Sequence, residues 1–171
     1  SAMIGIAIDD GIIANTQESV YDYLPKSYQY TKDEAKAKIT IEHLLTMSSG
    51  IGVYEDDYQE TEDWLKTVLE PKLKYEAGTR TNYMSADPFL LSVNLSERLS
   101  YPLEFYMHQK LFGPLGIDNY ILNTDDQGNP YFAGGLCMTP RDMLKFGQLY
   151  LNKGMWKGKR ILSEKWITDS F

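Results

Sequence analysis

The sequence predicts a mainly α-helical fold. In most segments apolar residues recur at the i, i+3, i+4 spacing of a helix, and short turns that contain glycine or proline separate these segments. Hardly any segment shows the alternation of apolar and polar residues that is typical of a strand. The 171 residues have the length of one domain of roughly 100–200 residues. We therefore expect residues 1–171 to belong to a single domain.

The first part of the chain contains three helical signals. The apolar run over 1–8 has the pattern of the second half of a buried helix, which Asp9-Asp10-Gly11 ends. A short helix or turn is expected over 16–24, where a proline stops it. Thr40 is expected to cap a clearer helix that is broken at Ser48-Ser49-Gly50.

The middle of the chain alternates a loop with further helices. Residues 52–60 are acidic and contain tyrosines, which favours a solvent-facing loop. A helix is expected to begin at Thr61-Glu62-Asp63, with acids at its positive end. Ser85 stands where the N-cap of the following helix is expected. Pro102 stands at the first position of another helix, which is expected to run to about Phe112.

The last third begins with a less regular stretch. Residues 118–138 are rich in Asn, Asp and Gly, which favours a long loop or a hairpin. Thr139, Pro140 and Asp142 form a typical helix start, with a cap, a proline at the first position and an acid three residues after the cap. Ser163 is expected to cap a last helix.

Composition excludes several classes of protein. The chain has 17 Lys and Arg against 24 Asp and Glu, a net charge of −7. This balance counts against nucleic acid as a partner, because phosphate binding requires clustered basic side chains. No stretch approaches the ~20 apolar residues that a membrane span needs. A single cysteine rules out an internal disulfide framework.

Three blocks of the sequence carry a family resemblance. Residues 39–50 end a leucine-rich helix in a Ser-Gly turn, and 76–85 run from an Ala-Gly turn to Tyr83-Met84-Ser85. Residues 134–147 join a Gly-Gly-Leu stretch to a helix that carries Asp-Met and Phe-Gly. In this order and spacing the blocks resemble the serine β-lactamase and penicillin-binding-protein-like family of serine hydrolases. Together they cover most of the chain.

The resemblance implies a fold and a chemistry. The chain would be the helical subdomain of a β-lactamase/transpeptidase-like α+β fold, and its sheet would come largely from sequence outside the chain. Members of the family attack an ester, amide or β-lactam carbonyl with the serine of a Ser-x-x-Lys motif and form an acyl-enzyme. A Lys-Thr-Gly or His-Thr-Gly strand supports the oxyanion. Neither motif occurs in this sequence. We expect the first a few residues before Ser1 and the second beyond Phe171.

The resemblance also implies roles for four residues. Tyr83 matches the catalytic tyrosine and would assist proton transfer. Ser85 stands where asparagine is more usual, and it would orient the substrate or Tyr83, cap the helix, or do both. Gly134 and Gly135 border the substrate in the family, although they would equally allow a tight turn into the next helix. No metal and no organic cofactor is implied.

Other chemically capable residues are expected to have structural roles. His43 and His108 are expected to be ordinary structural histidines, and Arg80 a surface residue. Cys137, between two apolar residues, is expected to be a buried small hydrophobe. The acids within 52–60 lack the spacing of a calcium loop or a glycosidase pair, so we expect them to be solvated.

The function expected from these features is that of a serine hydrolase fragment, inactive as this chain alone. Its complete form would act on a small-molecule ester, amide or β-lactam, and family resemblance points to a site outside the cytoplasm. The face left open where the sheet packs would permit self-association. The alternative is a non-catalytic binding or interaction domain on the same helical scaffold.

Overall fold

A computed structural model describes all of residues 1–171. The nine α-helices are α1 (Ala2–Asp9), α2 (Ile41–Leu45), α3 (Glu55–Tyr58), α4 (Trp64–Leu69), α5 (Ala86–Ser96), α6 (Leu103–Met107), α7 (Gly113–Leu115), α8 (Pro140–Leu151) and α9 (Glu164–Asp169). The 3₁₀ helices η1 (Val20–Tyr23), η2 (Lys26–Thr31) and η3 (Lys36–Lys38) precede α2, and the π-helical turn η4 (His108–Phe112) joins α6 to α7. Two antiparallel pairs complete the fold, β1 (Tyr120–Ile121) with β2 (Cys137–Met138) and β3 (Met155–Trp156) with β4 (Lys159–Arg160). The mainly helical prediction is confirmed.

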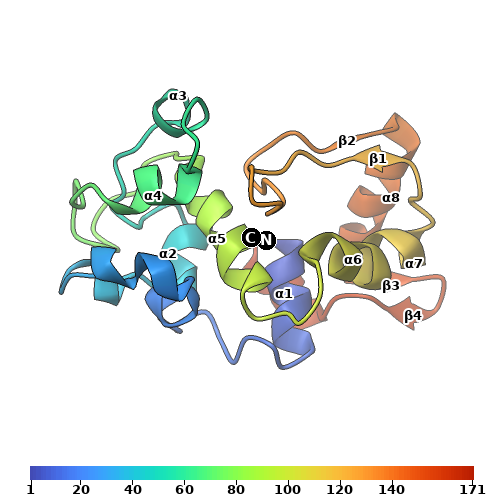
Figure 1. The fold of residues 1–171 in the computed structure, drawn as a ribbon. Helices are drawn as coiled ribbons and strands as arrows, with labels where there is room; N and C mark the ends of the chain where they lie inside the picture. The colour runs from blue at the N-terminus through green and yellow to red at the C-terminus, as the bar shows by residue number, and fades with distance from the viewer.

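Helix α5 lies at the centre of the molecule (Figure 1). Helices α2, α3 and α4 lie on one side of it, at the left of the figure. Helices α6, α7 and α8 lie on the other side, at the right. Helix α1 packs directly against α5. The segment between β1 and β2 reaches from the right-hand group back toward α5, so that residues distant in sequence meet above the central helix (Figure 1).

Three of the predicted helix starts are confirmed by their hydrogen bonds. The Thr40 hydroxyl accepts the His43 N–H at 3.3 Å, and the His43 ring accepts the Thr40 N–H at 3.2 Å. His43 is therefore a structural residue of a capping box. Thr139 accepts the Asp142 N–H at 3.2 Å, and Ser163 accepts the Trp166 N–H at 3.3 Å.

The helix expected to stop near Phe112 does not stop there. Its backbone continues through η4 into α7, and it ends only at Gly116, whose φ of +65° is a left-handed C-terminal conformation. Pro114 lies at the start of α7, directly after the π-helical turn η4. Pro102 is the N-cap of α6, one position before the predicted one.

The acidic stretch 52–60 is also more ordered than predicted. Residues 55–58 form the one-turn helix α3, and Tyr58 is completely buried. The Asp57 carboxylate accepts the Tyr54 N–H at 2.9 Å and so anchors the start of this turn. The acids of this stretch, Glu55, Asp56, Asp57 and Glu60, are all exposed, as predicted.

The hairpin of β3 and β4 was not indicated by alternation in the sequence. Lys157 and Gly158 connect the strands with φ values of +46° and +79°. Two successive positive φ angles are the signature of a type I′ turn, which suits the twist of a two-residue hairpin. Each strand has only two residues, which is too short for an alternation of apolar and polar residues to be recognised in the sequence.

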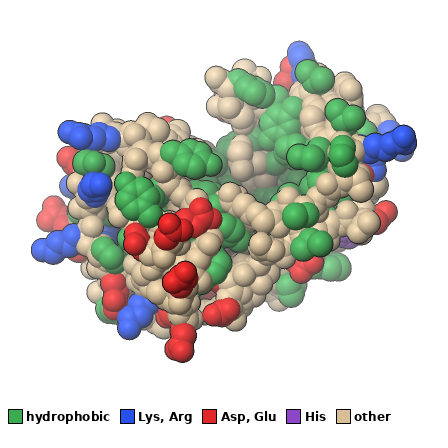
Figure 2. All heavy atoms as spheres, turned by 90° about the horizontal axis from the view of Figure 1, so that it is seen from above, with side chains coloured by type: hydrophobic (Ala, Val, Ile, Leu, Met, Phe, Trp, Pro, Cys, Tyr) green, Lys and Arg blue, Asp and Glu red, His purple; other side chains and the backbone are tan.

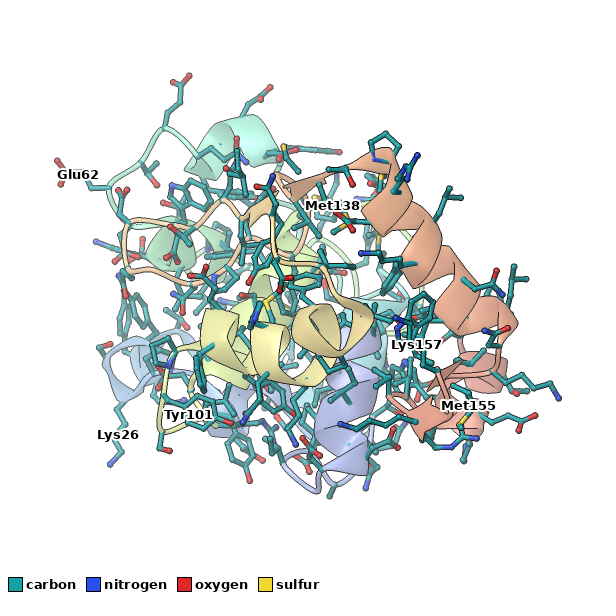
Figure 3. The ribbon with its side chains drawn as sticks, turned by 90° about the vertical axis from the view of Figure 1, so that its right-hand side faces the viewer. Lys26, Glu62, Tyr101, Met138, Met155 and Lys157 are labelled. Atoms are coloured by element: carbon teal, nitrogen blue, oxygen red, sulfur yellow. The ribbon has the colours of Figure 1, made fainter.

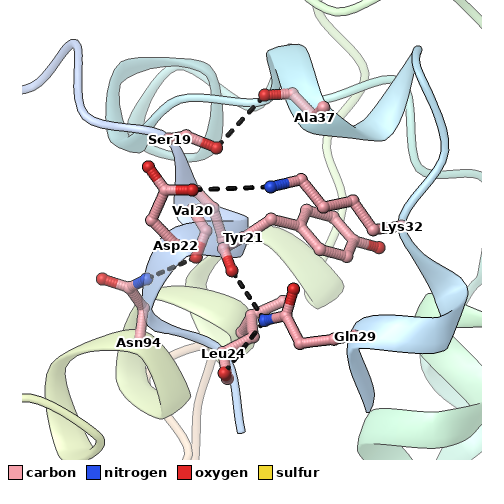
Figure 4. Close-up of polar contacts among 9 residues, drawn as sticks. All are labelled: Ser19, Val20, Tyr21, Asp22, Leu24, Gln29, Lys32, Ala37 and Asn94. Carbon is pink, nitrogen blue, oxygen red and sulfur yellow. Dashed lines mark hydrogen bonds and ion pairs between the residues drawn. The ribbon is translucent and has the colours of Figure 1, made fainter. Parts of the chain in front are cut away.

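Buried polar side chains of α5 tie the rest of the chain to it. The Asn94 amide donates to the Val20 carbonyl at 2.8 Å, while Gln29 donates to the carbonyls of Tyr21 and Leu24 at 2.7 and 3.1 Å (Figure 4). These bonds satisfy the backbone of η1, which forms no regular ladder of its own. The 3₁₀ segment is thereby held against the central helix.

Asp87, in the first turn of α5, is only 1% exposed. The Ser49 hydroxyl donates to its carboxyl at 2.5 Å and accepts the Ile51 N–H at 3.1 Å. Burial raises the pKa of Asp87 to about 7, although the hydrogen bonds from Ser49 act in the opposite direction. This pair joins the Ser-Gly turn after α2 to the start of α5.

The first and last residues of the chain both lie next to Tyr150. Ser1 interacts with the phenol of Tyr150, whose ring lies 6.2 Å from the Phe171 ring. The Ser163 N–H donates to Asp9 at 2.8 Å. Gly5 permits this packing, because a Cβ there would lie 2.4 Å from the indole ring of Trp166.

Helix α8 presents apolar side chains that nothing in the chain covers. Met143, Leu144 and Leu151 are 62%, 72% and 79% exposed. Met138 and Met155 mark the residues just before and just after this helix (Figure 3). None of the helices has both the length and the apolar character needed to cross a bilayer.

Substituting two helical glycines by alanine is expected to have opposite effects. Gly5→Ala should lower the free energy of unfolding by about 1–3 kcal/mol, because the new methyl group overlaps Trp166. Gly147→Ala should raise it by about 0.5–1 kcal/mol, since nothing lies within 4 Å of its added Cβ and alanine favours the helix. Urea unfolding followed by circular dichroism measures both. Stabilisation by Gly5→Ala would show that α1 and α9 do not pack this closely.

The buried carboxyl of Asp87 is expected to make stability depend on pH. Its folded pKa of about 7 lies above the unfolded value of about 3.9. The contribution of Asp87 to the free energy of unfolding is therefore complete below about pH 4, and it is lost as the pH rises to about 7. Relative to Asp87→Asn, the unsubstituted protein should lose at most about 1.4 kcal/mol per pH unit over that range. Urea unfolding between these pH values measures the difference, with the exposed Asp56→Asn as control. Parallel pH profiles for the unsubstituted protein and Asp87→Asn would contradict the expectation.

Candidate active site

Tyr83 lies in the extended stretch that leads into α5, and its side chain is 80% exposed. No hydrogen bond joins its phenol to the rest of the chain. The nearest arginine in sequence, Arg80, stacks instead on the Tyr75 ring, with its guanidinium carbon 4.8 Å from the ring centre. Arg80 thus behaves as a surface residue. No Lys or Arg stacks on the Tyr83 ring.

Ser85 occupies the N-cap position of α5 but does not cap the helix. Its φ and ψ of −64° and −22° are already helical, whereas a capping side chain needs an extended backbone to reach the free N–H groups. The Ser85 hydroxyl donates instead to Glu55 Oε2 at 3.2 Å. The prediction of a capping role is wrong, and the serine points to a partner 30 positions away.

Glu55 joins Ser85 to a second segment of the site. Its Oε1 accepts the Tyr131 phenol at 2.5 Å, and the Tyr131 oxygen lies 2.8 Å from that of Tyr58. Tyr131 and Tyr58 pack with Trp64 and Phe89, at ring-centre distances of 5.6 to 6.2 Å. The cluster of Glu55, Tyr58, Ser85 and Tyr131 was not predicted from the sequence.

The two phenols of this cluster remain protonated. Burial raises the pKa of Tyr58 far above its usual range, and its hydrogen bond to Tyr131 adds to the effect. Burial likewise raises the pKa of Tyr131, with the hydrogen bond to Glu55 as the next cause. The phenols therefore act as hydrogen-bond donors and not as bases. The only sequence signal was the three-residue spacing of Glu55 and Tyr58, which places both on one face of a helical turn.

An apolar cavity of about 510 Å³ lies beside this cluster. Its walls come from the start of α1, from α5, from the helical stretch of α6 and η4, from the segment between β1 and β2, and from α8. Fourteen of the 18 lining residues are hydrophobic, and no Lys, Arg, Asp or Glu is among them. Figure 2 looks down on this end of the molecule and shows a hollow with hydrophobic side chains at its base. The volume is typical of a small-molecule site.

The structure separates the two predicted glycines. Gly134 lines the cavity together with Tyr131. Gly135 does not line it, and it has a φ of +73° where a Cβ would lie 2.4 Å from the Asn123 amide. Gly135 is thus required by a tight turn, whereas Gly134 is placed where a ligand could approach. Ser85 and Gly134 are connected through Glu55 and Tyr131, while no side-chain hydrogen bond joins Tyr83 to either of them.

The remaining chemically capable residues stand apart from the cavity. Cys137 is exposed in β2, so the expectation of a buried cysteine is wrong. Its neighbour Met138 turns toward the cavity instead, as alternation along a strand requires. No three side chains of His, Cys, Asp or Glu come together in a way that could hold a metal ion.

Comparison with known proteins gives the geometry a context. A putative β-lactamase from Bacteroides dorei DSM 17855 is similar over 98% of this chain and 51% of its own, with 23% identity and a TM-score of 0.80. A putative 6-aminohexanoate-dimer hydrolase from Bacillus anthracis is similar over 98% of this chain and 49% of its own, with 20% identity and a TM-score of 0.81. An octameric penicillin-binding protein homologue from Pyrococcus abyssi is similar over 96% and 44%, with 19% identity and a TM-score of 0.69.

These likenesses concern the fold, and the chain spans about half the length of the solved structures that it matches. None of the curated protein sequences matches it significantly. The family model described as Beta-lactamase, however, matches residues 1–170, which is nearly the whole chain. The chain therefore belongs to the β-lactamase family, whose members include the penicillin-binding-protein-like serine hydrolases.

Proposed function

We propose that residues 1–171 are the helical part of a larger single hydrolase domain, which cleaves an ester, amide or β-lactam bond through an acyl-enzyme. The observation that carries this proposal is the family match over 1–170 together with an exposed tyrosine at the family's motif position. The serine nucleophile and its lysine would come from sequence outside these residues. No metal and no organic cofactor takes part.

The roles of the site residues follow from their positions. Tyr83, whose phenol is free of internal partners, transfers a proton between the nucleophile and the leaving group once nearby lysines favour its phenolate. Ser85 orients the substrate or Tyr83 from two positions further along the chain. Gly134 lets the backbone approach a substrate in the cavity, and Gly135 shapes the turn behind it.

The substrate is a small molecule with an ester, amide or β-lactam bond. The solved relatives are described as a putative β-lactamase, a putative 6-aminohexanoate-dimer hydrolase and a D-stereospecific amidohydrolase, among others. Their substrates differ, so the fold alone does not select one bond. The uncharged, apolar lining of the cavity favours an apolar moiety next to the bond that is cleaved.

A second candidate is a non-catalytic binding domain on the same scaffold. The apolar cavity favours it, because such a cavity can hold a small molecule without any nucleophile. The reading frame that encodes the chain distinguishes the two candidates. A Ser-x-x-Lys motif within about ten codons upstream of Ser1 supports the hydrolase, and its absence there supports the binding domain.

The exposed apolar face of α8 is the surface on which we propose that the rest of the domain packs. The isolated 171 residues should consequently self-associate through Met143, Leu144 and Leu151, since burying apolar surface is favourable. Light scattering at increasing concentration measures the association, and Leu144→Lys should weaken it. A monomer at the highest concentrations, before any substitution, would contradict the proposal.

Activity tests the role of Tyr83 directly. In the longer protein, Tyr83→Phe should lower kcat for an activated nitrophenyl ester by about 10²- to 10⁴-fold, the usual effect of losing a general acid or base. The exposed side chain makes a loss of stability small. Tyr101→Phe, which removes a hydroxyl without a hydrogen-bond partner, is the matched control.

The isolated chain provides the second control for this experiment. Without a nucleophile it should give no burst of nitrophenol and no mass increase from an acyl group. A stoichiometric burst from residues 1–171 alone would show that the nucleophile lies within them. An unchanged kcat for Tyr83→Phe in an active longer protein would exclude the tyrosine from the reaction.

A further inference from the structure

The cluster around Glu55 connects the two segments that the proposed function needs. One oxygen of its carboxylate accepts the Ser85 hydroxyl at 3.2 Å, and the other accepts the Tyr131 phenol at 2.5 Å. Ser85 belongs to the tyrosine motif before α5, whereas Tyr131 and Gly134 form a wall of the cavity. The Glu55 carboxylate therefore hydrogen-bonds to both segments, and the Ser85 hydroxyl also interacts with the Tyr131 phenol directly.

Glu55 is itself held in place on three sides. At the start of α3 the Tyr54 N–H donates to the Asp57 carboxylate at 2.9 Å. At the other end of the turn, Tyr58 packs in the aromatic cluster. The Gln59 amide donates to Glu55 Oε1 at 2.8 Å. Glu55 is exposed, and these contacts set the directions in which its two carboxylate oxygens point.

No cation takes part in these contacts. Glu55 forms no ion pair, and its three hydrogen-bond partners are two hydroxyls and an amide. Hydrogen bonds to an ionised acceptor are stronger than those between neutral groups. The carboxylate accepts hydrogen bonds from both hydroxyls and so links them.

Tyr131 transmits this constraint to the cavity. Its hydroxyl is held by Glu55 and Tyr58, while its ring forms part of the apolar wall beside Gly134. The segment that carries it reaches across from the right-hand group of helices toward α5 (Figure 1). The link through Glu55 joins this segment to Ser85, in addition to the aromatic packing, the Tyr58 phenol and the Ser92 hydrogen bond to the Pro130 carbonyl.

Resting on the proposed hydrolase function, we propose that Glu55 is a positioning residue that fixes the Tyr83-Met84-Ser85 motif relative to the cavity wall formed by Tyr131 and Gly134. It does not contact the reacting atoms. It acts through the Ser85 hydroxyl on one side and the Tyr131 phenol on the other. Loss of the carboxylate should loosen both segments while the helices elsewhere stay intact.

Amide hydrogen exchange of the 171-residue chain tests the link without any need for activity. Glu55→Ala should speed exchange about tenfold at the Phe89 amide, which donates to Ser85, and at the Tyr131 amide, which donates to Asn123. Glu55→Gln, which keeps one oxygen, should give an intermediate change. The Asn152 amide at the end of α8 should not change. Asp56→Ala, on the same turn and without side-chain partners, is the control.

The longer protein provides the functional measurement. There Glu55→Ala should lower kcat for a nitrophenyl ester about tenfold and leave KM within about twofold, with partial rescue by Glu55→Gln. Exchange rates equal to those of Asp56→Ala, exchange that rises equally along the whole chain, or an unchanged kcat would each overturn the proposal. If the unsubstituted longer protein is inactive, the hydrolase proposal fails, and Glu55 then has no reaction to position.

Discussion

The burial of α5 is the constraint on which the rest of the structure depends. Nine of its 11 residues are buried, so the helix has no solvent face on which to place polar groups. Every polar side chain within it must find a partner, because an unpaired buried group costs about 1–3 kcal/mol. Asp87 binds Ser49, Ser92 donates to the Pro130 carbonyl, and Asn94 binds the backbone of Val20. Each bond fixes a different segment against the central helix.

The same constraint explains the position of the candidate site. Asp87 and Ser92 fix the Ser-Gly turn and the segment before Tyr131 on neighbouring parts of α5. Tyr83 and Ser85 lie just before the first residue of the helix. The aromatic packing of Phe89 with Tyr58, Trp64 and Tyr131 holds Tyr131, which forms part of the cavity wall. The position of the site thus follows from the packing and hydrogen bonds of one buried helix, and not from any single motif.

Much of the fold could be predicted where local chemistry decides it. Thr40, Thr139 and Ser163 cap helices because their hydroxyls reach N–H groups within the same turn. Pro114 and Cys137 show the limit of such reasoning. A proline in a first turn need not end a helix, and a small apolar residue in a two-residue strand can face either side. The predicted capping role of Ser85 is wrong for a related reason, because its backbone is helical and its hydrogen-bond partner is distant in sequence.

The sequence by itself determined the helical class, most helix starts and the family, because these depend on patterns within a few residues or on blocks in a fixed order. Tertiary structure alone decided which residues meet. Ser85 lies 30 positions after Glu55 in the sequence, and Tyr131 lies 76 positions after it. No local pattern encodes contacts over such separations. They arise because the chain must cover α5 on all sides, and this brings the acid, the hydroxyl and the phenol to one end of the helix.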